Sequence, residues 1–134
     1  MANFLFDKAR EKFLNGDLSW RDDDFKVCLL DISLNSTSLN QQTLGEIVTS
    51  NRIAISSTEL SNKTSVNGVA KANGIQISGI STTKSIKSLV IFKVAPTLND
   101  SPLIAHIDTA DGIGFTPNSG NVIIQWNSSG IFKL

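Results

Sequence analysis

The sequence predicts a mainly β protein: an antiparallel β-sandwich, jelly-roll or Greek-key-like, of about eight short strands with one short N-terminal amphipathic helix. Ser, Thr and Asn supply 17, 10 and 12 of the 134 residues, an excess typical of turns and wet β-surfaces. From residue 52 onward, short apolar runs alternate with turn residues. The connections between these runs are too short for the crossovers of a parallel sheet, so we expect antiparallel pairing.

Length and charge limit the classes of protein that remain. A chain of 134 residues has the usual size of one domain with one core. The 12 Lys and Arg balance the 12 Asp and Glu, so no net field favours nucleic acid or an anionic membrane. No apolar run approaches the roughly 18 residues of a membrane span, and charge begins at Asp7. We expect no nucleic acid or membrane partner and synthesis in the cytoplasm without export.

The helix is predicted over residues 4–14, FLFDKAREKFL. Apolar residues recur at i, i+3 and i+7 from Phe6, and charged residues lie mostly off that stripe. Asn3 is the expected N-cap, and Gly16 stands just past the expected end. The aromatic face must pack on something, and we favour the helix's own domain over a partner.

The segment 1–24 closes with Trp20, Arg21 and three consecutive aspartates before the first predicted strand. Its simpler interpretation is a solvated linker. The alternative is a docking segment, in which a large aromatic anchor is oriented by neighbouring charges. On that hypothesis residues 25–134 form the β-sandwich within a single domain overall, and the interface with a partner or a second subunit consists of Phe4, Phe6, Phe13, Trp20 and Arg21.

Each strand is predicted from an apolar run between turn residues. Residues 25–32 are apolar on both faces, which favours a central strand. The polar stretch 33–51 is a long connection in which TLGEIV forms one helical turn. Asn-Gly pairs at 67–68 and 73–74 predict type I′ hairpins. The other expected strands lie in RIAIS, ELSNKTSV with a turn at SNK, VAKA, IQISGI, SLVIFKV, PLIAHIDT, NVIIQW and GIFKL.

Cys28 and His106 are the residues to test first for chemistry. A single cysteine excludes an intrachain disulfide and a thiolate zinc cluster, and the setting FKVCLLDI predicts a buried strand thiol. The only histidine lies in LIAHIDT, where alternation puts it on the same face as Asp108. We expect a partly exposed strand residue rather than a general base. The sequence therefore predicts no enzyme, no catalytic residue and no cofactor.

The stretch IDTADGIGFTPNSGNVIIQW, residues 107–126, is rich in glycine. Its spacing does not match the dinucleotide, P-loop or EF-hand patterns. Turn chemistry explains it better, as a long connection between two late strands. A loose surface calcium site that uses Asp108 and Asp111 remains the weak alternative, and otherwise no metal is expected.

Both ends of the chain carry a family resemblance. The opening MANFLFDKAREKFLNGDLSWRDDDFKVCLLD, the close IAHIDTADGIGFTPNSGNVIIQW and the terminal GIFKL resemble a family of small structural proteins encoded in tailed-bacteriophage genomes. The resemblance covers nearly the whole chain. It implies a capsid decoration, or cement, protein or a neighbouring head or tail component, made in the cytoplasm of the host bacterium. A cement protein is a β-rich homo-oligomer, a trimer being favoured, that binds the major capsid protein on the virion surface and stabilises the shell.

Two other classes remain open. The chain is alternatively a tail fibre, baseplate or adhesin-type module that contacts host surface glycans through turns such as 107–121. A hydrolase would need His106 paired with a carboxylate and a nucleophile in a cleft.

Overall fold

The protein is mainly antiparallel β-sheet with a single α-helix, α1 (Asp7–Leu14), among the residues described. The computed structural model describes residues 3–34, 38–80, 84–110, 113 and 120–134. The strands are β1 (Phe4–Leu5), β2 (Phe25–Leu30), β3 (Arg52–Ile55), β4 (Thr64–Val66), β5 (Val69–Lys71), β6 (Ile75–Ile80), β7 (Ser88–Lys93), β8 (Leu103–Ile107), β9 (Gly120–Ile124) and β10 (Phe132–Lys133). Short 3₁₀ turns are η2 (Leu44–Glu46), η3 (Thr49–Asn51) and η4 (Leu98–Asp100).

The strands form one large and two small sheets. The large sheet has the order β1-β8-β7-β2-β3, and the small ones have the orders β10-β5-β4 and β6-β9. Every pairing between the named strands is antiparallel, as the sequence predicts. The helical turn expected within TLGEIV is η2.

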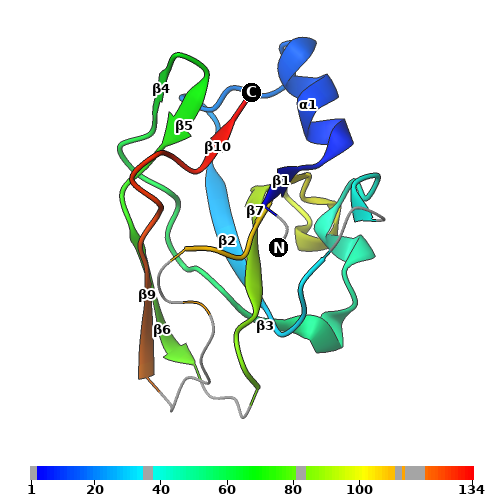
Figure 1. Cartoon of the computed structure of the whole chain (residues 1–134). Helices are drawn as coiled ribbons and strands as arrows, with labels where there is room; N and C mark the ends of the chain where they lie inside the picture. Colours follow the sequence, from blue (N-terminus) through cyan, green and yellow to red (C-terminus); the bar gives the residue numbers. More distant parts are fainter. Residues whose placement is uncertain (1–2, 35–37, 81–83, 111–112, 114–119) are drawn as a thin grey trace.

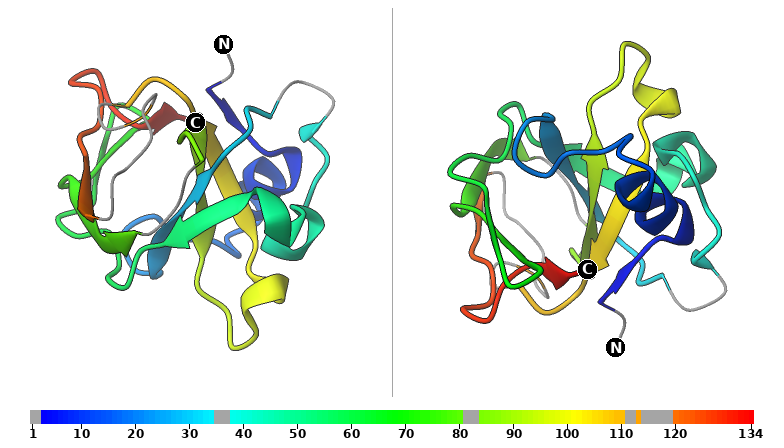
Figure 2. Two further views of the ribbon diagram at one scale, coloured as in Figure 1. Left: turned by 90° about the horizontal axis from the view of Figure 1, so that it is seen from below. Right: turned by 90° about the horizontal axis from the view of Figure 1, so that it is seen from above.

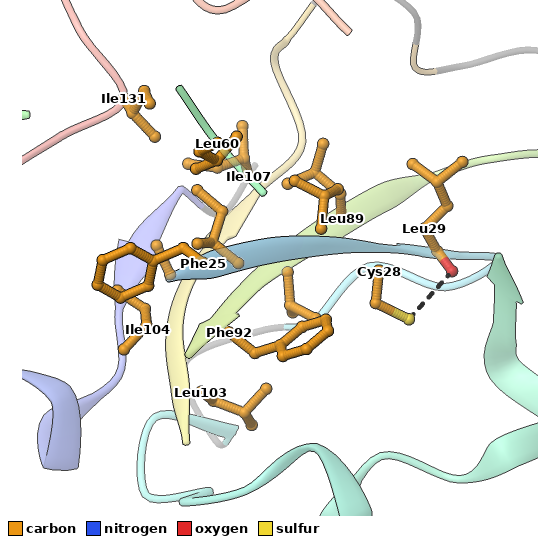
Figure 3. Packing of buried hydrophobic residues seen from close by; sticks show 14 of the residues in the cluster. Phe25, Cys28, Leu29, Leu60, Leu89, Phe92, Leu103, Ile104, Ile107 and Ile131 are labelled. Atoms are coloured by element: carbon orange, nitrogen blue, oxygen red, sulfur yellow. Dashed lines mark hydrogen bonds between the residues drawn. The ribbon is translucent and has the colours of Figure 1, made fainter. Parts of the chain in front are cut away.

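The large sheet is covered on both faces. β6 and β9 lie opposite one face, and α1 lies beside β8 on the other (Figures 1 and 2). Leu29, Leu89 and Ile107 are paired across neighbouring strands and point toward the small sheets, whereas Cys28 and Phe92 point to the other side (Figure 3). Because both faces are buried, the central strands are apolar at nearly every position.

The helix begins later than predicted, because Phe4–Leu5 forms strand β1 and pairs with β8. Asn3 does not cap the helix. Its Nδ2 donates to Thr109 Oγ1 at 2.6 Å, and its Oδ1 accepts the backbone N–H of Asp108 at 2.7 Å. These contacts extend the N terminus along β8, a long-range pairing that helical periodicity cannot reveal.

The end of the helix agrees with the prediction. Gly16 has a φ of 79°, the left-handed region that favours glycine. Its N–H donates to Phe13 O at 3.3 Å, and the N–H of Asp17 donates to Lys12 O at 2.8 Å. This pair of bonds is a Schellman motif, which satisfies carbonyls that the helix leaves open.

The two Asn-Gly pairs behave differently. The pair at 67–68 has φ values of 54° and 78° and joins β4 to β5, so the predicted type I′ hairpin is confirmed. The prediction for 73–74 is wrong, because β6 pairs with β9 and not with the strand before it. A Cβ at Gly74 would lie 2.7 Å from Ile124 O, so glycine there allows a close approach of two backbones.

Trp20 packs the N-terminal segment against the β-sheets. Its side chain is only 7% exposed. The indole N–H donates to Thr64 O at 3.0 Å and to Lys71 O at 3.3 Å. Its ring centroid lies 5.0 Å from that of Phe25 and 5.2 Å from that of Phe132. The anchor proposed for a partner therefore packs within this chain.

We expect Trp20→Ala to lower the free energy of unfolding by about 3–5 kcal/mol, because it removes a buried aromatic ring and leaves a cavity. The corresponding fall in Tm is roughly 10–20 °C. Thermal and urea unfolding followed by circular dichroism measure it. Arg21→Ala is the matched control, since the Arg21 side chain is 83% exposed and should cost little. Equal stability of the two variants would contradict the anchoring role.

Deletion of residues 1–24 should leave the remaining chain unfolded. Leu5, Phe6, Ala9 and Leu18 belong to the same hydrophobic cluster as the strands, so their loss exposes the α1 face of the large sheet. The methyl region of a proton NMR spectrum reports the outcome. A dispersed spectrum from the truncated chain would instead make the segment a separable docking element.

Candidate functional site

The predicted interface residues lie mostly inside the fold. Phe6 and Trp20 are buried. Phe4 and Phe13 are half-buried and pack against the core. Arg21 alone of the five is largely exposed. The role of these residues in a partner contact stays a prediction, and in this fold Phe6 and Trp20 stabilise the chain itself.

Arg21 pairs with its neighbour at the surface. Its Nε lies 3.2 Å from Asp22 Oδ1. The hydrogen bond and the charge of Arg21 hold the pKa of the Asp22 carboxyl below its ordinary value. Both side chains are exposed, so water screens the pair and it contributes little stability.

His106 is fully buried, which corrects the expectation of a partly exposed residue. Its Nε2 accepts the backbone N–H of Leu34 at 3.1 Å, and its ring stacks on Phe4 with 5.0 Å between centroids. Strand β1 and the chain around Leu34 cover the face that alternation alone left open. The imidazole satisfies a buried backbone donor, a structural task.

Cys28 is a buried strand thiol, as predicted. Desolvation raises the pKa of its thiol to about 12. The side chain lies on β2 among apolar neighbours (Figure 3). A thiol in such surroundings stays protonated and unreactive.

The Cys28 thiol should resist Ellman's reagent in the native protein at pH 8 and react fully in urea. At about four pH units below a pKa of about 12, roughly one thiol in 10,000 is ionised, and the reagent cannot reach it without opening of the fold. Absorbance at the thionitrobenzoate band follows the reaction. Ser128→Cys supplies an exposed thiol in the same chain as a control. Prompt native labelling of the wild type would overturn the buried assignment.

The weak calcium candidates are only partly visible. Asp108 is half-buried at the end of β8, and its backbone N–H donates to Asn3. Asp111 and most of the glycine-rich connection lie outside the described residues. Within the described ranges, no group of three or more His, Cys, Asp or Glu side chains is placed to hold a metal ion. Calcium binding stays a weak prediction.

Exposed apolar side chains occur at the end of the molecule that carries the C terminus. Leu14 is 81%, Val66 66% and Leu134 55% exposed. The C-terminal backbone bonds to the β4–β5 turn, and α1 packs on β10 through Phe13 and Phe132, whose ring centroids are 6.1 Å apart. In Figure 1, α1 and the β4–β5 hairpin lie on either side of the C terminus at this end. We call Leu14, Val66 and Leu134 the apolar end.

Sequence reasoning missed the apolar end, although one signal was present. Leu14 lies beside Phe13 but outside the apolar stripe of the helix, so helical periodicity alone marks it as an exposed leucine. Val66 and Leu134 are brought to the same small sheet only through the pairing of β4 and β10 with β5.

A second surface feature surrounds Trp126, between β9 and β10. Hollows of about 260, 200 and 350 Å³ adjoin here, and Trp126 and Asn127 line each of them. The indole N–H of Trp126 donates to Asn73 O at 2.9 Å. We call these hollows together the Trp126 pocket. Sequence reasoning did not predict this pocket, because Trp126 continues an apolar strand pattern that is typical of core residues.

No helix among the described residues is long and apolar enough to cross a bilayer. No protein-family model matches the chain, and comparison with curated proteins and with solved structures yields no match.

Proposed function

We propose that the chain is a non-enzymatic structural protein of a tailed-bacteriophage virion. In this proposal it is a capsid decoration protein that binds the major capsid protein on the capsid surface and stabilises the shell. The resemblance of its opening and closing segments to such proteins supports the family. The opposed sheets support a sandwich of the jelly-roll or Greek-key kind, which belongs to the same proposal.

The apolar end is the observation that carries the proposal. Leu14, Val66 and Leu134 are exposed to water at one end of the molecule, whereas most of its other large apolar side chains are buried. Single exposed apolar residues are ordinary, but several at one end favour a protein contact. Complete burial of one such side chain stabilises a complex by about 1.5–3 kcal/mol before the costs of association.

The positions of the only histidine and the only cysteine of the chain support a structural role for the protein. His106 and Cys28 are both buried, and His106 binds a backbone donor. Neither side chain borders the Trp126 pocket. A protein whose task is to bury area at contacts with the shell requires no reacting group.

A homo-oligomer, with a trimer favoured, belongs to this proposal. β4 is an edge of its sheet and is exposed along its length, so its outer backbone groups offer a place for a second copy to pair. A stable contact buries about 1,200–2,000 Å² in total. Sedimentation equilibrium of the free protein gives the mass that checks the state.

Purified protein should bind expanded empty capsids and should not bind bacterial envelopes. The double variant Leu14→Lys with Val66→Lys should fold normally, because both positions are exposed, and lose at least ten-fold in capsid affinity. Cosedimentation with capsids measures binding. Val48→Lys is the matched control, since Val48 is also exposed but lies on the segment between η2 and η3.

The outcomes separate the two main hypotheses. If the double variant bound capsids as tightly as the wild type, the apolar end would not be the surface that contacts the capsid. Binding to envelopes with none to capsids would contradict the decoration role and support the tail fibre, baseplate or adhesin alternative.

A further inference from the structure

The Trp126 pocket is built on a turn that its own hydrogen bonds hold in shape. Asn127 Oδ1 accepts the backbone N–H of Ser129 at 2.9 Å and its hydroxyl at 2.7 Å. The N–H of Gly130 donates to Asn127 O at 2.9 Å. Gly130 has a φ of 118°, and a Cβ there would lie 2.2 Å from Val69 Cγ1. The pocket wall is therefore preorganised, which lowers the entropic cost of binding a ligand.

The indole of Trp126 is fixed and only half-buried. Its N–H donates to Asn73 O on the neighbouring chain segment, so the ring is held in one orientation. The three hollows border the same side chain. An indole with its polar group satisfied offers the rest of its surface to an apolar ligand face.

Two of the three hollows are lined in part by apolar side chains and by one lysine each, Lys133 and Lys71, whereas the third is lined by Trp126 and uncharged polar side chains. Thr109, Gln125, Asn127 and Ser128 are exposed around Trp126 in one of the hollows. No acidic side chain lines any of the three, which disfavours a metal ion or a cationic ligand. Among the described residues, the side chain of Gln125 and the Nδ2 of Asn127 have no hydrogen-bond partner, so amide donors remain available.

We propose that the Trp126 pocket binds a neutral carbohydrate, one pyranose ring at a time. A pyranose has a face of C–H groups that packs on an indole and a rim of hydroxyls that suits amides and hydroxyl side chains. The hollow that the uncharged polar side chains line measures about 350 Å³, at the lower end of the usual range for small-ligand sites, which suits a ligand of the size of one pyranose ring. This would be a second binding site, separate from the proposed contact with the shell, because no residue of the apolar end lines it.

The chain provides its own internal reference for the test. It has two tryptophans, and the indole of Trp20 is buried and bonded within the fold. Titration of ¹⁵N-labelled protein with methyl α-glucoside, methyl β-galactoside or N-acetylglucosamine should shift the Trp126 indole N–H resonance and leave that of Trp20 unchanged. A shallow site predicts saturation near the millimolar range for at least one sugar. Trp126→Phe assigns the two resonances by removal of one.

A pair of glutamine variants separates ligand contact from stability. Gln125→Ala should weaken sugar binding several-fold because it removes an amide from the pocket. Gln76→Ala is the matched control, since Gln76 is exposed on β6 and lines none of the three hollows. Both should keep the wild-type Tm.

Three results would overturn the carbohydrate assignment. They are no shift with any of the three sugars, equal shifts of both indoles, and equal weakening by the two glutamine variants. Loss of capsid cosedimentation in Gln125→Ala without any sugar binding would instead assign the pocket to a protein partner. Sugar titration needs no capsid, so it can fail while the decoration role stands, and the reverse also holds.

Discussion

The contact of Trp20 with the strands is the interaction on which the rest of the structure depends. Its ring packs on Phe25 at the start of β2, an inner strand of the large sheet, and on Phe132 in the last strand, while its N–H donates to two carbonyls of the β4–β5 hairpin. One side chain thus joins the N-terminal segment, the large sheet and a small sheet. A buried indole with a satisfied donor avoids the cost of an unpaired polar group and stabilises all three elements together.

Burial of both faces of the large sheet has a second consequence. Polar groups that enter it must find partners inside the protein. His106 accepts the Leu34 N–H, and Ser56 Oγ accepts the N–H of Val27 at 3.0 Å. The same burial raises the pKa of Cys28. Cys28 and His106, which the sequence offers as candidates for catalysis, are therefore buried in the core. The candidate binding features lie instead on loops and at the ends of helices and strands.

The apolar end and the Trp126 pocket occur where the chain changes direction around β10. The first joins the end of α1, the β4–β5 hairpin and the C terminus. The Trp126 pocket lies between β9, which belongs to one small sheet, and β10, which belongs to the other. Edges and interruptions of sheets leave side chains without internal neighbours, so they are natural places for contacts with other molecules.

The sequence by itself determined the antiparallel β class, most strand positions, the end of the helix at Gly16 and the burial of Cys28. These follow from local patterns: alternation, turn residues and a left-handed glycine. Only the tertiary structure decided that residues 4–5 form a strand, that the second Asn-Gly pair is no hairpin and that His106 is buried. It also turned Trp20 inward and gathered the side chains of the Trp126 pocket. Those outcomes depend on pairings between residues more than 40 positions apart, for which the sequence has no local signal.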